Sequence, residues 1–235
     1  MRKPVIRLPL KGAENVRDIG GYVGDDNRVG NFGKFIRANY LKNITIDDNE
    51  YLKEFGITDI LDLRGEDESI LEPDSINKDY FTYHRVGLLT KKFNDNLMYE
   101  QENFDMGEGY VLLLENKTAI KEIFEILAKA KGGVIYHCTA GKDRTGIVSM
   151  LILGLSGVSK KDIIANYEVT YTYLPVIVNK EVVTNLIYSK PEYIKKAIEH
   201  IEKEYGTYKE YLLSCNIDNK VLEIVKEKYL GWFWS

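Results

Sequence analysis

The chain has 235 residues, of which 44% are hydrophobic and 11% aromatic, as expected for a soluble globular protein long enough for one well-packed domain. Its formal net charge is −4, so charge gives no basis for a general affinity for nucleic acids or anionic membranes. Any positively charged site must therefore be confined to a small region of this acidic protein.

The cysteines and the apolar segments exclude further classes. The chain has 2 cysteines, Cys138 and Cys215, which is too few for a disulfide framework. The longest apolar run, residues 147–158, is too short to span a bilayer, so we expect a buried helix and no stable membrane insertion. No signal peptide is visible, which makes the cytoplasm the default location and leaves export of a trimmed or leaderless form open.

The first half of the chain predicts strands that alternate with helices. Apolar or alternating segments predict strands at residues 5–8, 34–38, 58–63, 81–86 and 133–136. A helix is predicted from about Asp47 to Phe55, with Thr45 or Asp47 as its cap and Gly56 as its stop. A longer helix is predicted over residues 110–131, where apolar side chains recur at helical spacing. This alternation indicates an α/β fold with a central, mostly parallel sheet and crossover helices.

The chain after Gly157 predicts helices throughout. They cover residues 160–173 after the cap Ser159, residues 191–205 before the stop Gly206, and a last helix from Asp218 through residue 229. We therefore expect a single domain over residues 1–235, with residues from about 160 to 235 as a helical cover on one side of the sheet. Part of residues 165–189 is apolar enough to form a lid over a site, although core packing is the favoured interpretation.

The most informative segment is residues 137–146, which read His-Cys-Thr-Ala-Gly-Lys-Asp-Arg-Thr-Gly. Cys138 and Arg144 lie six positions apart, between a predicted strand and an apolar helix. A loop that enters a helix leaves backbone N–H groups for an anion, and Arg144 adds a planar fork that matches phosphate oxygens. Positive potential there favours the nucleophilic thiolate of Cys138. The segment predicts attack of a thiolate on a bound phosphate ester; the alternative is a buried cysteine at a strand end beside a surface arginine.

We also expect roles for the other residues of this segment. Gly141 can adopt a positive φ or let backbone approach the ligand closely. The hydroxyl of Thr145 can reach the sulfur, and the ring of His137 can orient the loop through hydrogen bonds. The residues expected to bind the phosphate are Thr139, Ala140, Gly141, Lys142, Arg144 and Thr145.

The pattern His-Cys-x-x-Gly-x-x-Arg-Thr-Gly resembles the phosphate-binding loop of the protein-tyrosine phosphatase superfamily, and the filling of residues 140–143 looks like an atypical bacterial lineage. Two further segments, Asn-Val-Arg-Asp-Ile-Gly-Gly at 15–21 and Asp-Leu-Arg at 62–64, are similar to elements of that lineage and stand in its order. The resemblance covers roughly residues 10 to 160. It implies a phosphatase-like fold and substrates that carry phosphotyrosine, in several members also phosphoserine, phosphothreonine or phosphoinositides.

A leaving oxygen needs a general acid. Asp143, inside the loop and next to Arg144, is our first choice, and the resemblance implies the same. The rival is Asp105, thirty-three residues before Cys138, because many superfamily members carry their acid on a separate loop at about that distance. Asp143 could instead shape the loop by pairing with a basic neighbour. Asp62 is a further candidate, although a carboxylate at a strand end is more often a cap or an ion-pair partner.

Three basic residues each have two interpretations. Lys142 on the rim of the loop would favour a substrate with extra phosphates, such as a phosphoinositide head group; otherwise it is a solvated lysine. Arg17 and Arg64 would support the mouth of the site. Otherwise they would pair with neighbouring acids, Arg17 with Asp18 and Arg64 with Glu66, Asp67 or Glu68.

The favoured function is a cysteine-dependent phosphatase that works through a phosphocysteine intermediate on phosphotyrosine proteins, with broad or dual specificity. The alternative is a phosphoinositide phosphatase. The histidines and carboxylates show no metal-ligand spacing, so we expect no metal and no other cofactor. A sulfurtransferase, an arsenate reductase or a non-catalytic phosphate-binding module are the other classes. Arsenate reduction needs resolving cysteines, for which Cys215 is a poor candidate, and a binding module would normally lose the nucleophile. No nucleic acid partner is expected, and the sequence carries no signal of oligomeric state.

Overall fold

The computed structural model describes residues 4–90, 105–174 and 188–231. A 5-stranded sheet in the order β1-β2-β5-β3-β4 lies at its centre. Strands β2 (Phe35–Ala38), β5 (Gly133–His137), β3 (Ile57–Asp62) and β4 (Thr82–Arg85) run parallel, and β1 (Arg17–Asp18) pairs antiparallel with β2. The predicted α/β fold with a mostly parallel sheet is confirmed.

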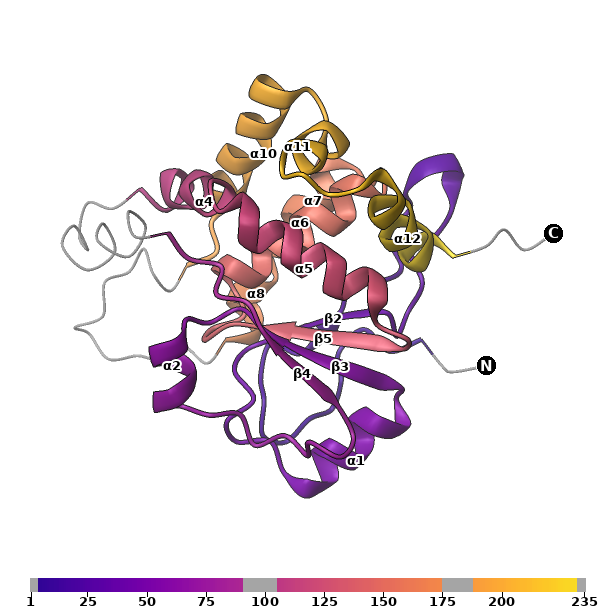
Figure 1. The fold of residues 1–235 in the computed structure, drawn as a ribbon, viewed down its shortest axis with the longest axis vertical. Coiled ribbons are helices and arrows are strands. Elements are labelled where there is room, and N and C mark those ends of the chain that lie inside the picture. The colour runs from indigo at the N-terminus through magenta and orange to yellow at the C-terminus, as the bar shows by residue number, and fades with distance from the viewer. Residues whose placement is uncertain (1–3, 91–104, 175–187, 232–235) are drawn as a thin grey trace.

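Helices cover both faces of the sheet, as Figure 1 shows. On one face lies α1 (Ile46–Glu54), whose Leu52 belongs to the same buried cluster as Ile36 and Ile135 of the sheet. Their strand neighbours Phe35 and Tyr136 belong to the cluster on the other face, because successive side chains of a strand point to opposite sides. That second cluster is formed with α4 (Met106–Leu114), α5 (Lys117–Lys129), α6 (Asp143–Leu155), α7 (Lys160–Glu168), α10 (Pro191–Tyr205), α11 (Tyr208–Ser214) and α12 (Asn219–Leu230). The helical C-terminal part is thus confirmed.

Several predicted helix ends are present as expected. Thr45 caps α1 and forms a capping box with Asp48, and Gly56 follows with a φ of +83°. Ser159 caps α7, and Asp218 caps α12. Local side-chain chemistry was sufficient to place these ends.

Other predicted elements differ from the structure. The single helix expected over residues 110–131 is wrong: α4 and α5 are separate, because Asn116 caps α5 through the Ala119 N–H and also donates to the Leu89 carbonyl. The helix expected over residues 160–173 is divided at Val169 into α7 and the short α8 (Thr170–Tyr173). Residues 5–8 form no strand and only an isolated bridge from Arg7.

The short helix α2 (Glu66–Leu71) and the 3-10 turn of residues 25–27 were not predicted, and α11 was expected only as part of a helical C-terminal stretch without bounds. The lid considered within residues 165–189 falls partly on 175–187, which lie outside the described residues. None of the helices in the described part of the chain has the length and apolar character needed to cross a membrane.

The topology places the conspicuous loop at the centre of one sheet edge. Strand β5 lies between β2 and β3, and Cys138 follows its last residue. Open parallel sheets bind ligands at the carboxyl ends of their strands. Cys138 therefore lies at the carboxyl end of a central strand.

Candidate active site

A tight loop, residues 138–142, joins β5 to α6. Gly141 has a φ of +68°, and a Cβ on this residue would lie only 2.4 Å from the carbonyl oxygen of Ala38. Only glycine fits this conformation and this close approach. Cys138 is 2% exposed, at the entrance to the first turn of α6, whose N–H groups have no intrahelical partners. The loop is therefore suited to hold an anion beside a thiol.

Arg144 lies in the first turn of α6 and is held by Glu68 of α2. Its Nη1 donates to Glu68 Oε2 at 2.6 Å and its Nη2 to Oε1 at 2.9 Å. The Thr139 hydroxyl donates to Glu68 Oε1 at 3.0 Å, and the Gly65 N–H donates to Oε2 at 2.9 Å. One carboxylate thus joins α2, the loop and the arginine fork.

This pairing determines the charges at the mouth. Burial disfavours the charged guanidinium, but Cys138, Glu68 and Asp143 together raise the pKa of Arg144 above its ordinary value. Burial likewise opposes ionisation of Glu68, yet the hydrogen bonds from Arg144 lower its pKa. Both groups stay charged at neutral pH. From the sequence, Glu68 was expected only as a partner for Arg64, although its position three residues after Gly65 indicates a capping role.

Asp143 begins α6, and its side chain is 24% exposed. Its Oδ1 accepts a hydrogen bond from the Tyr110 hydroxyl of α4 and lies 3.3 Å from Lys142 Nζ. The Tyr110 hydroxyl lies 2.5 Å from that of Tyr167. Burial raises the pKa of both tyrosines well above the ordinary value, so both remain neutral. The Asp143 carboxylate is thus partly open to solvent and is held by the Tyr110 hydroxyl. Neither tyrosine was predicted from the sequence as part of the site.

Asp105 has a different environment. It caps α4 by accepting from the N–H groups of Gly107 and Glu108, and it forms a 2.8 Å ion pair with Lys196 of α10. The hydrogen bond from Lys196 lowers the pKa of Asp105, against a smaller opposing effect of burial. A helix cap that ionises so readily is a poor proton donor at neutral pH.

Lys142 is fully buried, so neither a solvated lysine nor a solvated position on the rim describes it. Its Nζ donates to the Tyr188 carbonyl at 3.2 Å, in addition to its contact with Asp143. The interpretation as a solvated lysine was therefore wrong, because the side chain lies inward at the start of α6 and links the loop to the segment before α10. Its affinity for a substrate with extra phosphates stays a prediction.

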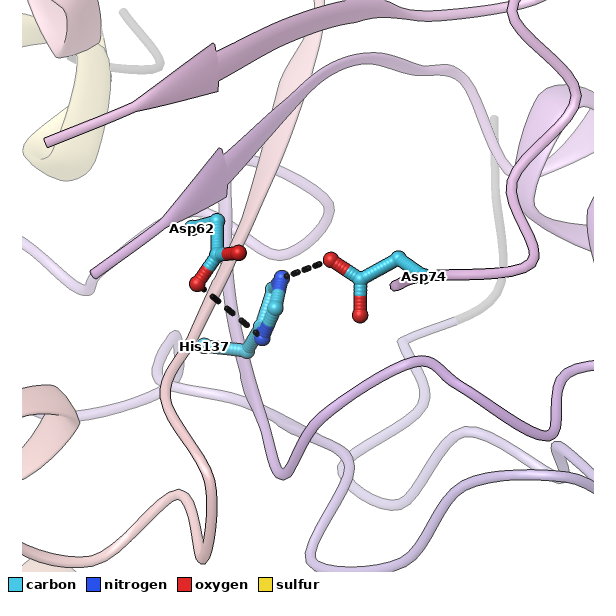
Figure 2. A group of neighbouring side chains, drawn as sticks. All are labelled: Asp62, Asp74 and His137. Carbon is cyan, nitrogen blue, oxygen red and sulfur yellow. Dashed lines mark ion pairs between the residues drawn. The ribbon is translucent and has the colours of Figure 1, made fainter. Parts of the chain in front are cut away.

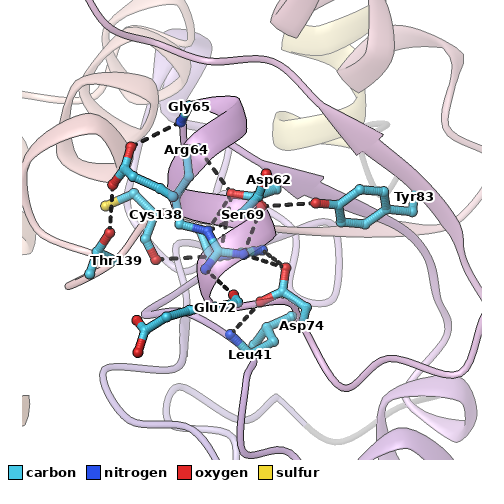
Figure 3. Close-up of polar contacts among 12 residues, drawn as sticks. Leu41, Asp62, Arg64, Gly65, Ser69, Glu72, Asp74, Tyr83, Cys138 and Thr139 are labelled. Atoms are coloured by element: carbon cyan, nitrogen blue, oxygen red, sulfur yellow. Dashed lines mark hydrogen bonds and ion pairs between the residues drawn. The ribbon is translucent and has the colours of Figure 1, made fainter.

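Arg64 forms a buried ionic cluster with Asp62 and Asp74 (Figure 3). Its Nη2 lies 2.8 Å from Asp62 Oδ2 and 2.9 Å from Asp74 Oδ2. The expected pairing with Glu66, Asp67 or Glu68 is therefore wrong. Burial would raise the pKa of Asp62, but the hydrogen bonds from Arg64 and the nearby His137 ring keep it below its ordinary value. Asp62 is thus an ion-pair partner rather than an acid.

His137 connects this cluster to the loop. Its Nε2 lies 3.1 Å from Asp74 Oδ2 without the alignment of a hydrogen bond, and its Nδ1 lies 3.3 Å from the Cys138 carbonyl oxygen. Ligand atoms of Asp62, Asp74 and His137 come within 4.8 Å of one another, as a metal site requires. Figure 2 shows the two aspartates on either side of the His137 ring. Both carboxylates already pair with the Arg64 guanidinium, so the group fits an ionic support for the loop better than a cation site.

The remaining predicted residues lie on the buried side of the loop. Arg17 is buried and binds Asn15 and the α7–α8 region instead of Asp18, whose carboxylate accepts from the Gly20 and Gly33 N–H groups. The alternative pairing of Arg17 with Asp18 is wrong. Thr145 is fully buried, but its hydroxyl makes no hydrogen bond within the described residues, so the expected bond to the sulfur is not observed.

The second cysteine is separate from this chemistry. Cys215 ends α11, is buried, and donates to the Tyr211 carbonyl at 3.4 Å. Burial raises the pKa of this thiol, which disfavours its thiolate. Cys215 therefore has the properties of a structural residue.

A cysteine directly after a central parallel strand and an arginine in the first turn of the following helix are the arrangement of a phosphatase-like site. The chain matches the Tyrosine phosphatase family over residues 8–231 and belongs to that family. It is 38% identical over 144 residues to a tyrosine-protein phosphatase of Nostoc commune, an alignment that covers 60% of this chain and 49% of that protein. The chain thus spans about half the length of that relative.

Two further relatives align over most of their length. A putative tyrosine-protein phosphatase of Cupriavidus necator is 27% identical over 224 residues, covering 87% of this chain and 82% of that protein. The triple specificity protein phosphatase PtpB of Mycobacterium tuberculosis is 24% identical over 278 residues, covering 94% and 98% respectively.

Proposed function

We propose that this chain hydrolyses phosphate monoesters through a phosphocysteine intermediate, with phosphotyrosine proteins as the favoured substrates and a broad or dual specificity. The observation that carries the proposal is the position of Cys138 directly after β5 and of Arg144 in the first turn of α6, on either side of the short loop that joins them. The N–H groups at the N-terminus of a helix attract an anion, so this position suits a bound phosphate.

In the first step the Cys138 thiolate attacks phosphorus in line with the ester oxygen. Arg144 and the loop N–H groups hold the equatorial oxygens, where charge gathers in the transition state. The S–P bond forms as the P–O bond to the leaving group breaks, and Asp143 gives its proton to the departing oxygen. In the second step water attacks the phosphocysteine, Asp143 accepts a proton from that water, and the thiolate and inorganic phosphate are released.

The surroundings of the two aspartates support Asp143 as the acid. Asp143 is next to Arg144 in sequence and is partly exposed, whereas Asp105 is engaged as a cap and in an ion pair with Lys196. The buried Cys215 supports hydrolysis over a mechanism that needs a resolving thiol. An intact Cys138 argues against a purely binding function.

Protein substrates are favoured over phosphoinositides for a reason specific to this chain. The phosphoinositide alternative depended on a free positive charge from Lys142 on the rim, and that side chain is buried and bound to the Tyr188 carbonyl. The relative named as a triple specificity phosphatase supports breadth beyond phosphotyrosine.

The test is a comparison of kcat/KM on a phosphotyrosine peptide, on matched phosphoserine and phosphothreonine peptides, and on a short-chain phosphatidylinositol phosphate. We expect the phosphotyrosine peptide to be fastest and Cys138→Ser to lose turnover on all of them. Absence of turnover by the wild type, or activity retained in Cys138→Ser, would overturn the mechanism. A lipid preferred over every peptide would overturn only the substrate assignment.

A further inference from the structure

The back of the phosphate-binding loop is held by side chains from distant segments. Asn15 is fully buried, and its Nδ2 donates to the carbonyl oxygens of Ala140 at 3.1 Å and Gly141 at 3.0 Å. Arg37 of β2 is also fully buried, and its Nη2 donates to the same Gly141 oxygen at 2.8 Å. Two consecutive peptide carbonyls of the loop are thereby fixed on its inner side.

Fixing these carbonyls determines where the N–H groups point. In a trans peptide the C=O and the N–H lie on opposite sides of the chain. Because the Ala140 and Gly141 oxygens face Asn15 and Arg37, the N–H groups of Gly141 and Lys142 must point away from them. An anion-binding loop requires this orientation, since its N–H groups have to face the ligand together.

The side chains behind the loop form one connected network. Arg17 Nη1 donates to Asn15 Oδ1, which fixes the orientation of that amide, and Arg17 Nη2 donates to the Asn166 carbonyl and the Thr170 hydroxyl, both at 2.8 Å. Arg37 Nη1 donates to Asn166 Oδ1 at 2.8 Å. Asn15 itself has a φ of +53°, a left-handed conformation that asparagine tolerates better than most residues.

This network is positively charged. In the described part of the chain, the hydrogen bonds of Arg17 and Arg37 go to amides, carbonyls and a hydroxyl, and no carboxylate pairs with either guanidinium. Burial lowers the pKa of both arginines, and for Arg37 the charge of Cys138 is among the groups that oppose this shift. The attraction is mutual, so a buried positive charge at Arg37 favours both the thiolate and a bound phosphate.

We propose that Asn15 and Arg37 are positioning residues of the active site, which aim the loop N–H groups at the phosphate, and that Arg37 also supplies buried positive charge behind it. Neither residue has to touch the substrate for this. The inference rests on the proposed function, because it assumes that the loop binds the phosphate of a substrate.

The test compares Asn15→Ala, Arg37→Met and Arg37→Lys with the control Arg28→Lys. Arg28 also forms a two-pronged contact, but with Glu227 of α12, away from the loop. The first measurement is the protection of Cys138 from iodoacetamide by inorganic phosphate, which gives a dissociation constant without any turnover. Asn15→Ala loses two hydrogen bonds to the loop and Arg37→Met loses one. Such losses within a charged site predict a constant roughly tenfold larger or more in both variants. The control should match the wild type.

The pH profile of the alkylation separates the two parts of the proposal. Arg37→Met removes a charge, so the rise of the alkylation rate should move to higher pH. Asn15→Ala removes a neutral amide and should leave the profile in place. Arg37→Lys keeps the charge without the fork, so it should weaken phosphate binding and retain the profile. A purely structural role would affect all three profiles alike or none of them.

Urea unfolding of each variant shows whether the comparison is valid, and Arg37→Lys replaces Arg37→Met if the latter does not fold. Phosphate protection at the wild-type level in folded Asn15→Ala and in the folded Arg37 variant would overturn the proposal. Equal weakening in the control Arg28→Lys would overturn it as well. Failure of the proposed function would appear differently. In that case phosphate would protect Cys138 of the wild type from alkylation, but the wild type would not hydrolyse aryl phosphates.

Discussion

The Tyr110 hydroxyl donates a hydrogen bond to Asp143 Oδ1 and thereby joins α4 to the first turn of α6. Asp143 is the carboxylate that we propose as general acid, and Tyr110 has no exposed surface. A neutral tyrosine behind a partly exposed carboxylate can restrict the rotation of that carboxylate while leaving its outer oxygen open to the substrate. The orientation of Asp143 for proton transfer would then depend on Tyr110, a residue that does not contact the substrate.

Tyr110→Phe tests this relationship. We expect a roughly 3- to 30-fold loss of kcat on phenyl phosphate and a smaller loss on p-nitrophenyl phosphate, because only the poorer leaving group needs the proton. The matched control is Tyr211→Phe, which removes a buried hydroxyl that donates to the Leu114 carbonyl instead. Equal losses on both esters, or the same pattern in Tyr211→Phe, would contradict a role in positioning Asp143.

Replacing the two aspartates separates the candidate acids. Asp143→Asn should slow phenyl phosphate turnover by roughly 10²–10⁴-fold and an activated ester much less. Asp105→Asn should leave both rates nearly unchanged and lower only the stability of α4, which Asp105 caps. The opposite pattern in steady-state kinetics would assign the acid to Asp105, and a loss from Asp143→Asn that is equal for all esters would indicate that Asp143 only shapes the loop.

Gly141→Ala tests the conformation of the loop. The substitution forces a Cβ into a positive-φ position and against the Ala38 carbonyl oxygen, a backbone atom that cannot move aside easily. We expect at least about 10²-fold less kcat/KM and a destabilisation of roughly 1–3 kcal/mol. Gly206 has a similar φ of +81°, but a Cβ there would meet only the flexible end of Glu210. Gly206→Ala should therefore lower stability in urea unfolding and leave turnover intact; a similar loss of turnover in both would contradict the argument.

The sequence predicted the sheet, most helix ends and the loop because these depend on local patterns. Thr45, Ser159 and Asp218 cap the helices that their positions indicated. The position of Cys138 was predicted from the local pattern of a strand, a short loop and a helix. No longer-range contact was needed for these predictions.

The partners of buried charges were not predictable in the same way. Arg64 was expected to pair with Glu66, Asp67 or Glu68, yet it pairs with Asp62, 2 residues before it, and with Asp74, 10 residues after it. Arg37 lies in a buried strand without any motif, and only the parallel pairing of β2 with β5 places it behind Gly141. Glu68 and Arg144 are 76 positions apart. Such contacts depend on strand order, which a single sequence does not specify.

The last prediction concerns stability and pH at Asp18. Burial raises the pKa of this carboxyl from 3.8 to about 6, although hydrogen bonds from the Gly33 and Gly20 N–H groups offset part of the shift. Between those two pH values the folded protein keeps a proton that the unfolded chain releases, so the contribution of Asp18 to the free energy of unfolding falls as the pH rises. The shift corresponds to at most about 3 kcal/mol, complete above the folded pKa.

The measurement is urea unfolding of the wild type and of Asp18→Asn from pH 4 to pH 7. Other carboxylates, such as Asp62 and Glu68, have lowered pKa values and stabilise the protein in the opposite direction, so only the difference between the two proteins isolates Asp18. Asparagine cannot ionise, and its oxygen can still accept one of the two backbone hydrogen bonds. The free energy of unfolding of the wild type, minus that of the variant, should therefore decrease by up to about 3 kcal/mol as the pH rises through this range. A difference that stays constant with pH would show that Asp18 has the same pKa in the folded and unfolded states, and an increase would show that the hydrogen bonds from Gly20 and Gly33 outweigh burial.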